Sequence, residues 1–420
     1  GNRNTAIGYY AMFENTTGFD NTAIGCKALC SNTEGLYNTA IGNGALRCNT
    51  TGSSNNALGN TALKANTTGG NNTAMGSEAL LANTTASDNT AIGRRALNKN
   101  ITGCNNNAMG YYSLACNISG HYNTAIGQCS LYSNWGGCYN TAIGCGNLRQ
   151  NTTGRSNLAI GYRAMLLNTT GDYNVAIGDH PLNANSTGCC NTAIGNSALA
   201  VNTTGNRNIA IGPEVLYSNT TGANNTALGR CTLYRNISGS NNTAIDDLAL
   251  WSNTTGNSNF AVGSEALRYN TTGNYNIGLG PAALAGCSSG STASYNIAFG
   301  SNAHRHSLSG HNNFAAGQYA LCSNWGGCYN TAMGYRALCS NTTGSYNHAV
   351  GYQALKSNTT GIYNNAKGNH ALYNNTTGGY NNAFGTYALY SNTTGYYNTA
   401  IGQNTLRSNT TANYNTAIGY

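Results

Sequence analysis

The chain of 420 residues carries a formal net charge of +8, yet only 7% of its residues are charged, against about 25% in ordinary soluble domains. Its 19 basic residues are scattered, with Arg94-Arg95 as the only adjacent pair, whereas nucleic-acid binders gather Lys and Arg on one face. No apolar run approaches the ~20 residues of a membrane span. We therefore expect no nucleic-acid partner and no membrane span in this segment.

A 17-residue unit, Asn-Thr-Ala-Ile-Gly-x-x-Ala-Leu-x-x-Asn-Thr-Thr-Gly-x-x, is repeated along the whole chain. Units begin at Asn4 and at every seventeenth residue up to Asn276, and after one slip of three residues they resume at Asn296. Residues 1–420 are therefore predicted to form a single continuous array of 24 full units, with the slip at about 287–295. A fixed period of this length is typical of a solenoid, in which each unit stacks on the next.

Positions 1 to 17 are counted from the first Asn of each unit, and the first nine are expected to hold the strands. The segment Thr-Ala-Ile at positions 2–4 accepts β-branched or aromatic residues at position 2, which favours a strand. Alternation would place positions 2 and 4 on one face and the Ala of position 3 in a narrow interior. The Ala-Leu segment at positions 8 and 9 suits a second strand or a single helical turn, and we favour the strand.

Glycines at positions 5 and 15 predict two turns per unit, because Gly reaches positive φ without a steric clash. Asp246 replaces the Gly of position 5 in one unit, and Asp is among the few residues that tolerate the left-handed region. These features together predict an all-β fold, a parallel β-solenoid (β-roll) of 17-residue rungs. Each position then becomes a column, with amide ladders of Asn at positions 1 and 12 and an apolar stripe of Leu at position 9.

The Asn of position 12 opens an Asn-x-Ser/Thr triplet in nineteen units, which is the acceptor sequence for N-glycosylation. A structural interpretation competes, in which the Asn starts a turn. It is favoured because the Asn persists where the triplet is broken, as at Asn32, Asn134 and Asn324. Glycosylation requires outward-pointing amides, and the chain would then be a glycoprotein. The candidate glycan acceptors are Asn15, Asn49, Asn66, Asn151, Asn219 and Asn409.

Fifteen cysteines in a chain without a catalytic pattern indicate an oxidising compartment and predict disulfides. Stacking brings three pairs to neighbouring rungs, one pair in a single column and two in adjacent columns. Bridges within a rung compete, because the two units that end in Asn-Trp-Gly-Gly-Cys, at 134–138 and 324–328, each carry an earlier Cys. Sequence alone leaves the connectivity open. The candidate disulfides are Cys322 with Cys339, Cys129 with Cys145, and Cys30 with Cys48.

No catalytic or cofactor-binding pattern is found, so we expect neither an enzyme nor a bound cofactor. Asp246-Asp247 is the only adjacent carboxylate pair, and neighbouring residues rarely share a catalytic task. His304, His306 and His311 lie beside the slip, which indicates a repaired irregularity rather than a metal site. No paired Cys-x-x-Cys motifs occur for zinc.

Tyrosine is abundant, with 29 residues, and often stands at position 17, as at Tyr37, Tyr122, Tyr275 and Tyr397. A column of exposed tyrosines can stack along a rod. The structural interpretation explains the column by stacking alone. The functional one makes it a contact surface for carbohydrate or for another fibre.

The segment Asn-Thr-Ala-Ile-Gly-x-x-Ala-Leu resembles the YadA-like (haemagglutinin-type) head repeats of trimeric autotransporter adhesins. It is also similar to the Asn-Thr-Ala-Ile-Gly/Asn-Thr-Thr-Gly arrays of bacterial and phage fibre proteins. The resemblance spans the whole chain through one short motif, and it implies a left-handed parallel β-roll with three chains per fibre at the cell surface. The chain departs from the adhesin pattern in its longer repeat unit and in Lys367, which stands at position 4 where Ile is usual. If position 4 lined a threefold axis, three copies of Lys367 would meet in a dry core, which is energetically costly.

We therefore expect a structural subunit of an extracellular fibre or filament, a stiff rod of stacked rungs. Its partner would be further copies of itself, arranged end to end or side by side, outside the cell or on the cell surface. The alternative is an adhesin head or phage tail-fibre shaft that binds surface glycans through exposed Tyr and Asn ladders. Carbohydrate is then the second partner.

Overall fold

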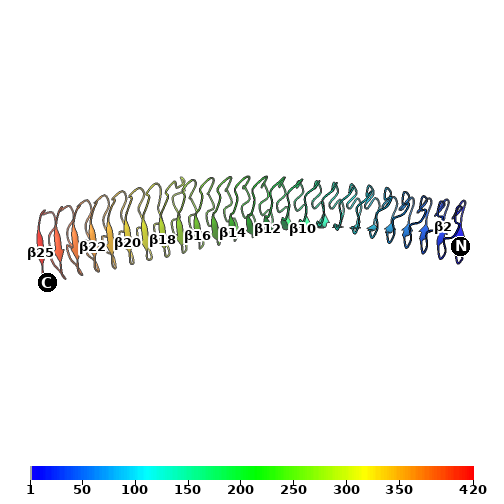
Figure 1. The fold of residues 1–420 in the computed structure, drawn as a ribbon. Helices are drawn as coiled ribbons and strands as arrows, with labels where there is room; N and C mark the ends of the chain where they lie inside the picture. Colours follow the sequence, from blue (N-terminus) through cyan, green and yellow to red (C-terminus); the bar gives the residue numbers. More distant parts are fainter. Residues whose placement is uncertain (1) are drawn as a thin grey trace. The chain divides into compact units, whose positions relative to one another are not determined.

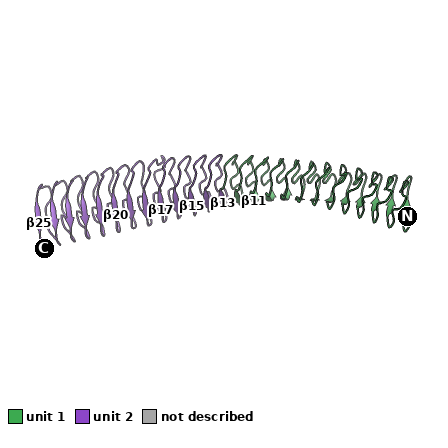
Figure 2. Ribbon diagram, viewed as in Figure 1, with its two compact units in different colours: residues 1–207 green, residues 208–420 purple. Residues whose placement is uncertain are grey.

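The structure, a computed structural model, describes residues 2–420. Within that range it contains β-strands joined by turns and bends and no helix, which confirms the predicted all-β parallel solenoid. The chain divides into two compact units, Gly1–Arg207 (unit 1) and Asn208–Tyr420 (unit 2) (Figure 2). Each unit is a stack of narrow coils, or rungs, with one strand per rung (Figure 1).

The strands of unit 1 pair in parallel, each with the next strand along the chain, and identical positions of the repeat face one another. Ala23 faces Ala40, for example, and Ile24 faces Ile41. The twelve strands are β1 (Thr5–Ile7), β2 (Thr22–Ile24), β3 (Thr39–Ile41), β4 (Asn56–Leu58), β5 (Thr73–Met75), β6 (Thr90–Ile92), β7 (Asn107–Met109), β8 (Thr124–Ile126), β9 (Thr141–Cys145), β10 (Leu158–Tyr162), β11 (Val175–Asp179) and β12 (Thr192–Ile194).

The strands of unit 2 pair in the same way, and they keep this register across the slip, where Ile277 faces Ile297. The thirteen strands are β13 (Ile209–Ile211), β14 (Thr226–Leu228), β15 (Thr243–Ile245), β16 (Phe260–Val262), β17 (Ile277–Leu279), β18 (Ile297–Phe299), β19 (Phe314–Ala316), β20 (Thr331–Met333), β21 (His348–Val350), β22 (Asn365–Lys367), β23 (Asn382–Phe384), β24 (Thr399–Ile401) and β25 (Thr416–Ile418).

The Ala-Leu segment forms a turn, so the predicted second strand is wrong. Positions 7 and 9 take left-handed φ values, 56° at Lys27 and 51° at Leu29, which curl the chain tightly. The neighbouring rungs accept the N–H groups of the curl, because Lys27 N donates to Tyr9 O at 2.7 Å and Leu29 N donates to Ala45 O at 2.9 Å. The segment therefore satisfies its backbone without strand or helix bonds of its own.

Glycine is required at two positions for two different reasons. At position 5, Gly25 has a φ of 132° and Asp246 has a φ of 93°, which confirms the predicted turn. At position 15, Gly35 has no positive φ, so the predicted left-handed turn is wrong there. A Cβ at Gly35 would lie 2.4 Å from Asn32 Oδ1 and 2.4 Å from Gly52 O. Space rather than φ selects glycine at position 15.

The interior of each rung is filled by Ala at positions 3 and 8 and Leu at position 9. Ala23, Ala28 and Leu29 are completely buried, which confirms the narrow interior and the apolar Leu column. Thr22 and Ile24 face outward, as predicted for positions 2 and 4. Burial of each Leu stabilises the fold by ~1.5–3 kcal/mol, which offsets a cost of ~1–2 kcal/mol for its left-handed backbone.

Two columns of buried Asn side chains close every regular rung. At position 1, Asn123 N donates to Asn106 Oδ1 at 3.0 Å and Asn123 Nδ2 donates to Gly137 O at 2.9 Å. At position 12, Asn134 Nδ2 donates to Asn117 Oδ1 at 2.8 Å and to Gly137 O at 2.8 Å. Both columns thus meet at the carbonyl of position 15. The predicted amide ladders are confirmed.

Candidate functional site

Burial of the position-12 column limits what the predicted glycan acceptors can do. Asn49, Asn66, Asn151 and Asn219 are completely buried. Asn66 Nδ2, the atom that would carry a glycan, donates to Asn49 Oδ1 at 2.8 Å and to Gly69 O at 2.9 Å. A sugar on this nitrogen would replace one of these bonds and would have to leave a filled interior. These four side chains do not meet the condition of an outward amide on which glycosylation rests.

The other two glycan candidates are less buried. Asn15 Nδ2 donates to Gly18 O at 3.0 Å, and Asn409 Nδ2 donates to Asn392 Oδ1 at 3.1 Å and to Ala412 O at 3.2 Å. Both side chains are half-buried. Glycosylation at Asn15 and Asn409 stays a prediction.

All fifteen cysteines are free thiols, so the disulfide prediction is corrected. Cys30, Cys48 and Cys129 are half-buried and Cys145 is exposed, and none of them is bridged. One rung of separation, about 4.8 Å, lies within the Cα range of a disulfide, but that distance alone does not form a bridge, because the two Cβ atoms must also approach to about 3.8 Å with the right orientation. Stacking therefore brings cysteines near one another without fixing a bond between them.

The two cysteines that share a column, Cys322 and Cys339, interact as thiols. A hydrogen bond from Cys322, helped by the nearby charges of Arg336 and Lys356, outweighs the opposite effect of burial and lowers the pKa of Cys339 to about 7. The same contact raises the pKa of Cys322. In unit 1, burial raises the pKa of Cys129. Because the thiolate is the reactive form, Cys339 is the thiol prepared for reaction and Cys129 is not.

The slip breaks one Asn ladder and spares the other. At position 1, Asn296 N donates to Asn276 Oδ1 at 3.0 Å, so that column continues across the insertion. At position 12, Cys287 and Ser307 stand where the repeat has Asn. Cys287 belongs to the rung that follows Asn270, so that rung offers no ladder amide to Asn270 Oδ1, and both Asn270 Oδ1 and Ser307 Oγ are buried without a partner among the described residues. The extra residues therefore disturb only one side of the coil.

His304 repairs the broken ladder from the Leu column. It is completely buried, and Asn324 Nδ2 lies 3.1 Å from its Nε2. Because an amide nitrogen donates, Nε2 accepts and the ring proton lies on Nδ1, an atom with no partner among residues 2–420. Burial lowers the pKa of His304 to about 4. Sequence reasoning missed this contact, although the joint exchange of Leu for His304 and of Asn for Ser307 in one unit is its signal.

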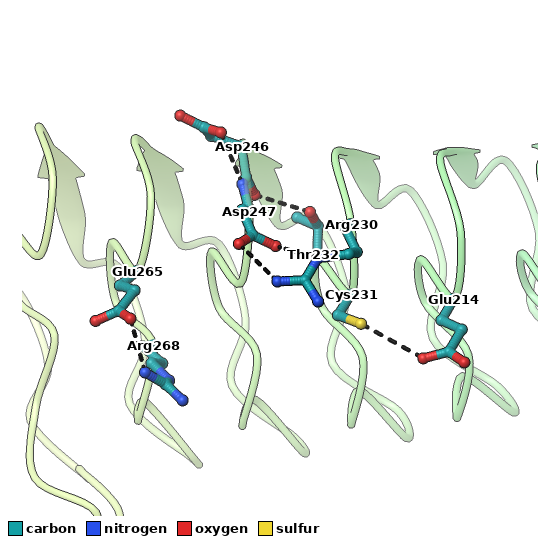
Figure 3. A network of polar contacts seen from close by, with 8 residues as sticks. All are labelled: Glu214, Arg230, Cys231, Thr232, Asp246, Asp247, Glu265 and Arg268. Atoms are coloured by element: carbon teal, nitrogen blue, oxygen red, sulfur yellow. Dashed lines mark hydrogen bonds and ion pairs between the residues drawn. The ribbon is translucent and has the colours of Figure 1, made fainter.

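A network of polar contacts links the rungs around β15 (Figure 3). Arg230 donates to the Asp247 carboxylate at 3.1 and 3.0 Å, and Asp246 Oδ1 accepts from Asp247 N at 2.8 Å. Cys231 Sγ lies 3.4 Å from Glu214 Oε2, and burial, with this carboxylate, raises the pKa of Cys231. Both Asp side chains are engaged and the thiol stays protonated. The network therefore links rungs and offers neither a free base nor a nucleophile.

Position 17 of unit 2 forms an exposed tyrosine ladder, which confirms the predicted stacking column. Neighbouring ring centroids lie 4.7 to 5.1 Å apart with planes within 16° of parallel. Each ring covers the faces of its neighbours, so the ladder presents ring edges and hydroxyls to solvent. The ladder consists of Tyr329, Tyr346, Tyr363, Tyr380, Tyr397 and Tyr414. In unit 1, Tyr122 and Tyr139 stack as a pair at position 17, with ring centroids 5.1 Å apart.

Positions 2 and 4 of unit 1 form a flat outward surface, which we call the strand-face stripe. Position 4 is Ile, Leu or Met in every rung of this unit, and no charged residue stands at either position. Ile24 is 36% exposed and Met109 is 43% exposed, although each is flanked by its neighbours in the column. In unit 2 the exposed Lys367 interrupts the apolar column. Position 4 thus gives the stripe an apolar column that runs through all twelve rungs of unit 1.

Comparison of the chain with protein-family models and with curated proteins finds no match. Among the described residues, no three His, Cys, Asp or Glu side chains gather in a way that could ligate a metal ion. The same residues include no helix with the length and hydropathy of a membrane span. The strand-face stripe of unit 1 and the tyrosine ladder of unit 2 are the candidate contact surfaces.

Proposed function

We propose that the chain is a structural subunit of an extracellular fibre or filament and that copies associate side by side. The strand-face stripe carries this proposal. It is apolar at position 4 of all twelve rungs of unit 1, uncharged, and not covered by any other part of unit 1. Contiguous exposed apolar surface of this extent marks an interaction site.

The stripe is long enough for an extended contact between two copies. With about 4.8 Å between strands, twelve rungs give a stripe roughly 55 Å long. Its two outward columns lie about 7 Å apart, because positions 2 and 4 of a strand are separated by two rises of about 3.3 Å. A second copy is the partner whose side chains repeat with the same spacing, so every rung finds an equivalent rung opposite.

The interior supports a mechanical role. Each regular rung is tied to the next by strand bonds and by both Asn columns, as at Asn117 and Asn134. Buried, fully bonded polar ladders are costly to open, because each broken bond leaves an unpaired group away from water. A rod with these links resists local unfolding, which is the property that a fibre subunit requires.

The alternative proposal, suggested by the resemblance to adhesin heads and phage fibres, is binding of surface glycans. The exposed tyrosine ladder favours it, since aromatic residues are common at binding surfaces. Two observations weigh against the predicted mode. The Asn columns are buried, and the faces of the ladder rings are occupied by one another. A threefold fibre around the position-4 column remains part of this proposal.

Sedimentation velocity and negative-stain microscopy of the full chain test the filament proposal. We expect concentration-dependent lateral assemblies, and we expect Ile126→Lys with Ile143→Lys to weaken them at least tenfold. These side chains lie mid-stripe, where a buried unpaired charge is strongly unfavourable. Thr153→Lys is the matched control, because it adds the same charge at an exposed position 14. A wild-type chain that stays monomeric at high concentration would contradict the proposal, and retention on a glycan array at micromolar concentration would favour the alternative.

A further inference from the structure

In two rungs, an exposed tryptophan stands at a position where threonine usually forms a hydrogen bond to the next rung. At position 13, Thr commonly bonds to the next rung, as Thr152 Oγ1 does to Thr169 O at 2.9 Å. Trp135 and Trp325 stand at this position, each followed by two glycines. Their side chains are 55% and 48% exposed. The rungs thus give up a bond and expose a large apolar ring, a combination that structure alone does not favour.

The Trp135 side chain lines a hollow in unit 1 with a volume of ≈ 460 Å³. Tyr132 and Arg149 line the same hollow, together with the hydroxyl and amide side chains of Thr152 and Gln150. Arg149 lies over the Tyr132 ring at 6.0 Å from its centroid. The hollow therefore combines two aromatic rings, one cation and several neutral hydrogen-bonding groups.

The Trp325 side chain lines a second hollow, in unit 2, with a volume of ≈ 440 Å³. Tyr269, Arg305 and His306 line it as well, and the His306 ring stacks on Trp325 at 6.4 Å. This hollow lies at the slip, whereas the Trp135 hollow lies among regular rungs. The same set of Trp, Tyr and Arg has therefore been assembled twice from different local sequences.

One arginine in each hollow has its charge free for a ligand. Among the described residues, neither Arg149 nor Arg305 takes part in an ion pair. Arg268, which also lines the Trp325 hollow, is already bound to Glu265 at 2.8 Å. An unpaired guanidinium presents a fork of donors that matches a carboxylate.

We propose that the two tryptophan hollows bind acidic saccharides, one uronic-acid-type unit in each. The exposed indole face suits the C–H face of a sugar ring, and the free arginine binds its carboxylate. The sugar hydroxyls suit Gln150 and Thr152 in the Trp135 hollow and Ser288 in the Trp325 hollow. The volumes lie in the range of small-ligand sites. Nucleic acid fits less well, because it requires many phosphate contacts along a basic stripe. The proposal goes beyond the filament assignment and does not rest on it.

Isothermal titration calorimetry of the full chain with digalacturonate tests the proposal, with the neutral digalactose as comparison ligand. We expect two sites per chain and a preference of about tenfold or more for the acid, the effect of one charged hydrogen bond. Trp135→Thr and Trp325→Thr should each remove one site. Both variants restore the residue that the repeat prefers, so they are expected to fold. Arg149→Gln and Arg305→Gln should abolish the preference for the acid.

Trp251→Ala is the matched control, because Trp251 stacks on Tyr234 beneath Arg235 and lines neither hollow. It should leave both sites intact. Equal binding of the acidic and neutral disaccharides would overturn the proposal. So would two sites that survive in the double Trp variant, or displacement of digalacturonate by sodium sulfate at equal concentration, which would indicate simple anion capture.

Discussion

Unit 1 keeps both Asn ladders unbroken from rung to rung, whereas unit 2 loses the position-12 ladder at the slip. In unit 1 every position 12 is Asn, and the described amide bonds run through the column, as from Asn117 to Asn100 at 2.7 Å. In unit 2, Ser307 leaves a gap that His304 fills from another column. The comparison shows that a rung can lose an amide if a buried side chain supplies another acceptor.

His304 forms fewer hydrogen bonds than the Asn side chain that it replaces in the ladder. An Asn both accepts from one neighbour and donates to the other, but His304 only accepts, and its Nδ1 proton stays unpaired. It is also titratable, whereas Asn is not. Unit 2 is therefore expected to lose stability in acid where unit 1 does not. Four changes, taken from the largest expected effect to the smallest, test this and the other differences between the two units.

The largest effect is expected for Asn117→Ser in unit 1, which copies the exchange at the slip without its repair. The change removes the donor to Asn100 Oδ1 and Gly120 O and the acceptor of Asn134 Nδ2. Three buried groups lose a bond, so unit 1 should lose about 3–5 kcal/mol of stability. Hydrogen exchange of unit 1 peptides measures this loss. Asn43→Ser, at an exposed position, is the control and should change stability by less than about 0.5 kcal/mol.

Acidification should destabilise unit 2 through His304. Its pKa falls from an ordinary value of 6.5 to about 4 in the fold, so the unfolded chain binds more protons between these values. The stability is complete above pH 6.5 and is lost as the pH falls towards 4, by about 3 kcal/mol. Urea denaturation at pH 7 and pH 4 measures the loss. His304→Leu with Ser307→Asn restores the repeat and should remove this difference, and an equal loss in that variant would rule out His304 as the cause.

Stacking of the tyrosines should contribute more in unit 2 than in unit 1. Tyr380 stacks on both Tyr363 and Tyr397, whereas Tyr122 stacks on Tyr139. Stacked pairs contribute roughly 0.5–1.5 kcal/mol each, so Tyr380→Ser should cost about 1–2 kcal/mol and Tyr122→Ser about half as much. Thermal unfolding of both variants measures the two losses. Equal losses would mean that the second stacking partner of Tyr380 contributes nothing to stability.

The fourth prediction concerns the reactivity of two thiols, and no change in stability is expected. At pH 7, Cys339 in unit 2, with a pKa of about 7, should react with iodoacetamide about tenfold faster than Cys129 in unit 1. Cys322→Ala removes the donor that now bonds to Cys339 and should slow the reaction. Mass spectrometry of tryptic peptides measures both rates. Faster labelling of Cys129 than of Cys339 would contradict the assignment.

Much of the rung could be predicted from the repeat because each invariant residue has one dominant physical reason. The Ala of position 3 fits only a narrow interior, and the Asn columns need partners that stacking supplies. The turn at positions 6–11 could not be predicted, since Leu29 occupies a left-handed conformation that its own propensity disfavours and that the neighbouring rungs stabilise. The reason for glycine at position 15 could not be predicted either. A side chain at Gly35 is excluded by contact with Gly52 O, an atom of the next rung, and not by a positive φ.

The candidate surfaces were predicted less well than the fold. The tyrosine ladder follows directly from position 17. The thiol pair Cys322–Cys339 was located correctly, but its bonding was not, because sequence gives proximity and not the distance between sulfur atoms. The hollows beside Trp135 and Trp325 are lined by side chains from several rungs, so the sequence of a single 17-residue repeat does not reveal them.

Fibre diffraction from aligned chains tests most directly the claim that successive 17-residue units stack as rungs. We predict a strong meridional reflection near 4.8 Å, the spacing of paired strands, and its retention in His304→Leu with Ser307→Asn. A pattern without this reflection, or one with the 5.4 Å pitch of α-helices, would contradict the account.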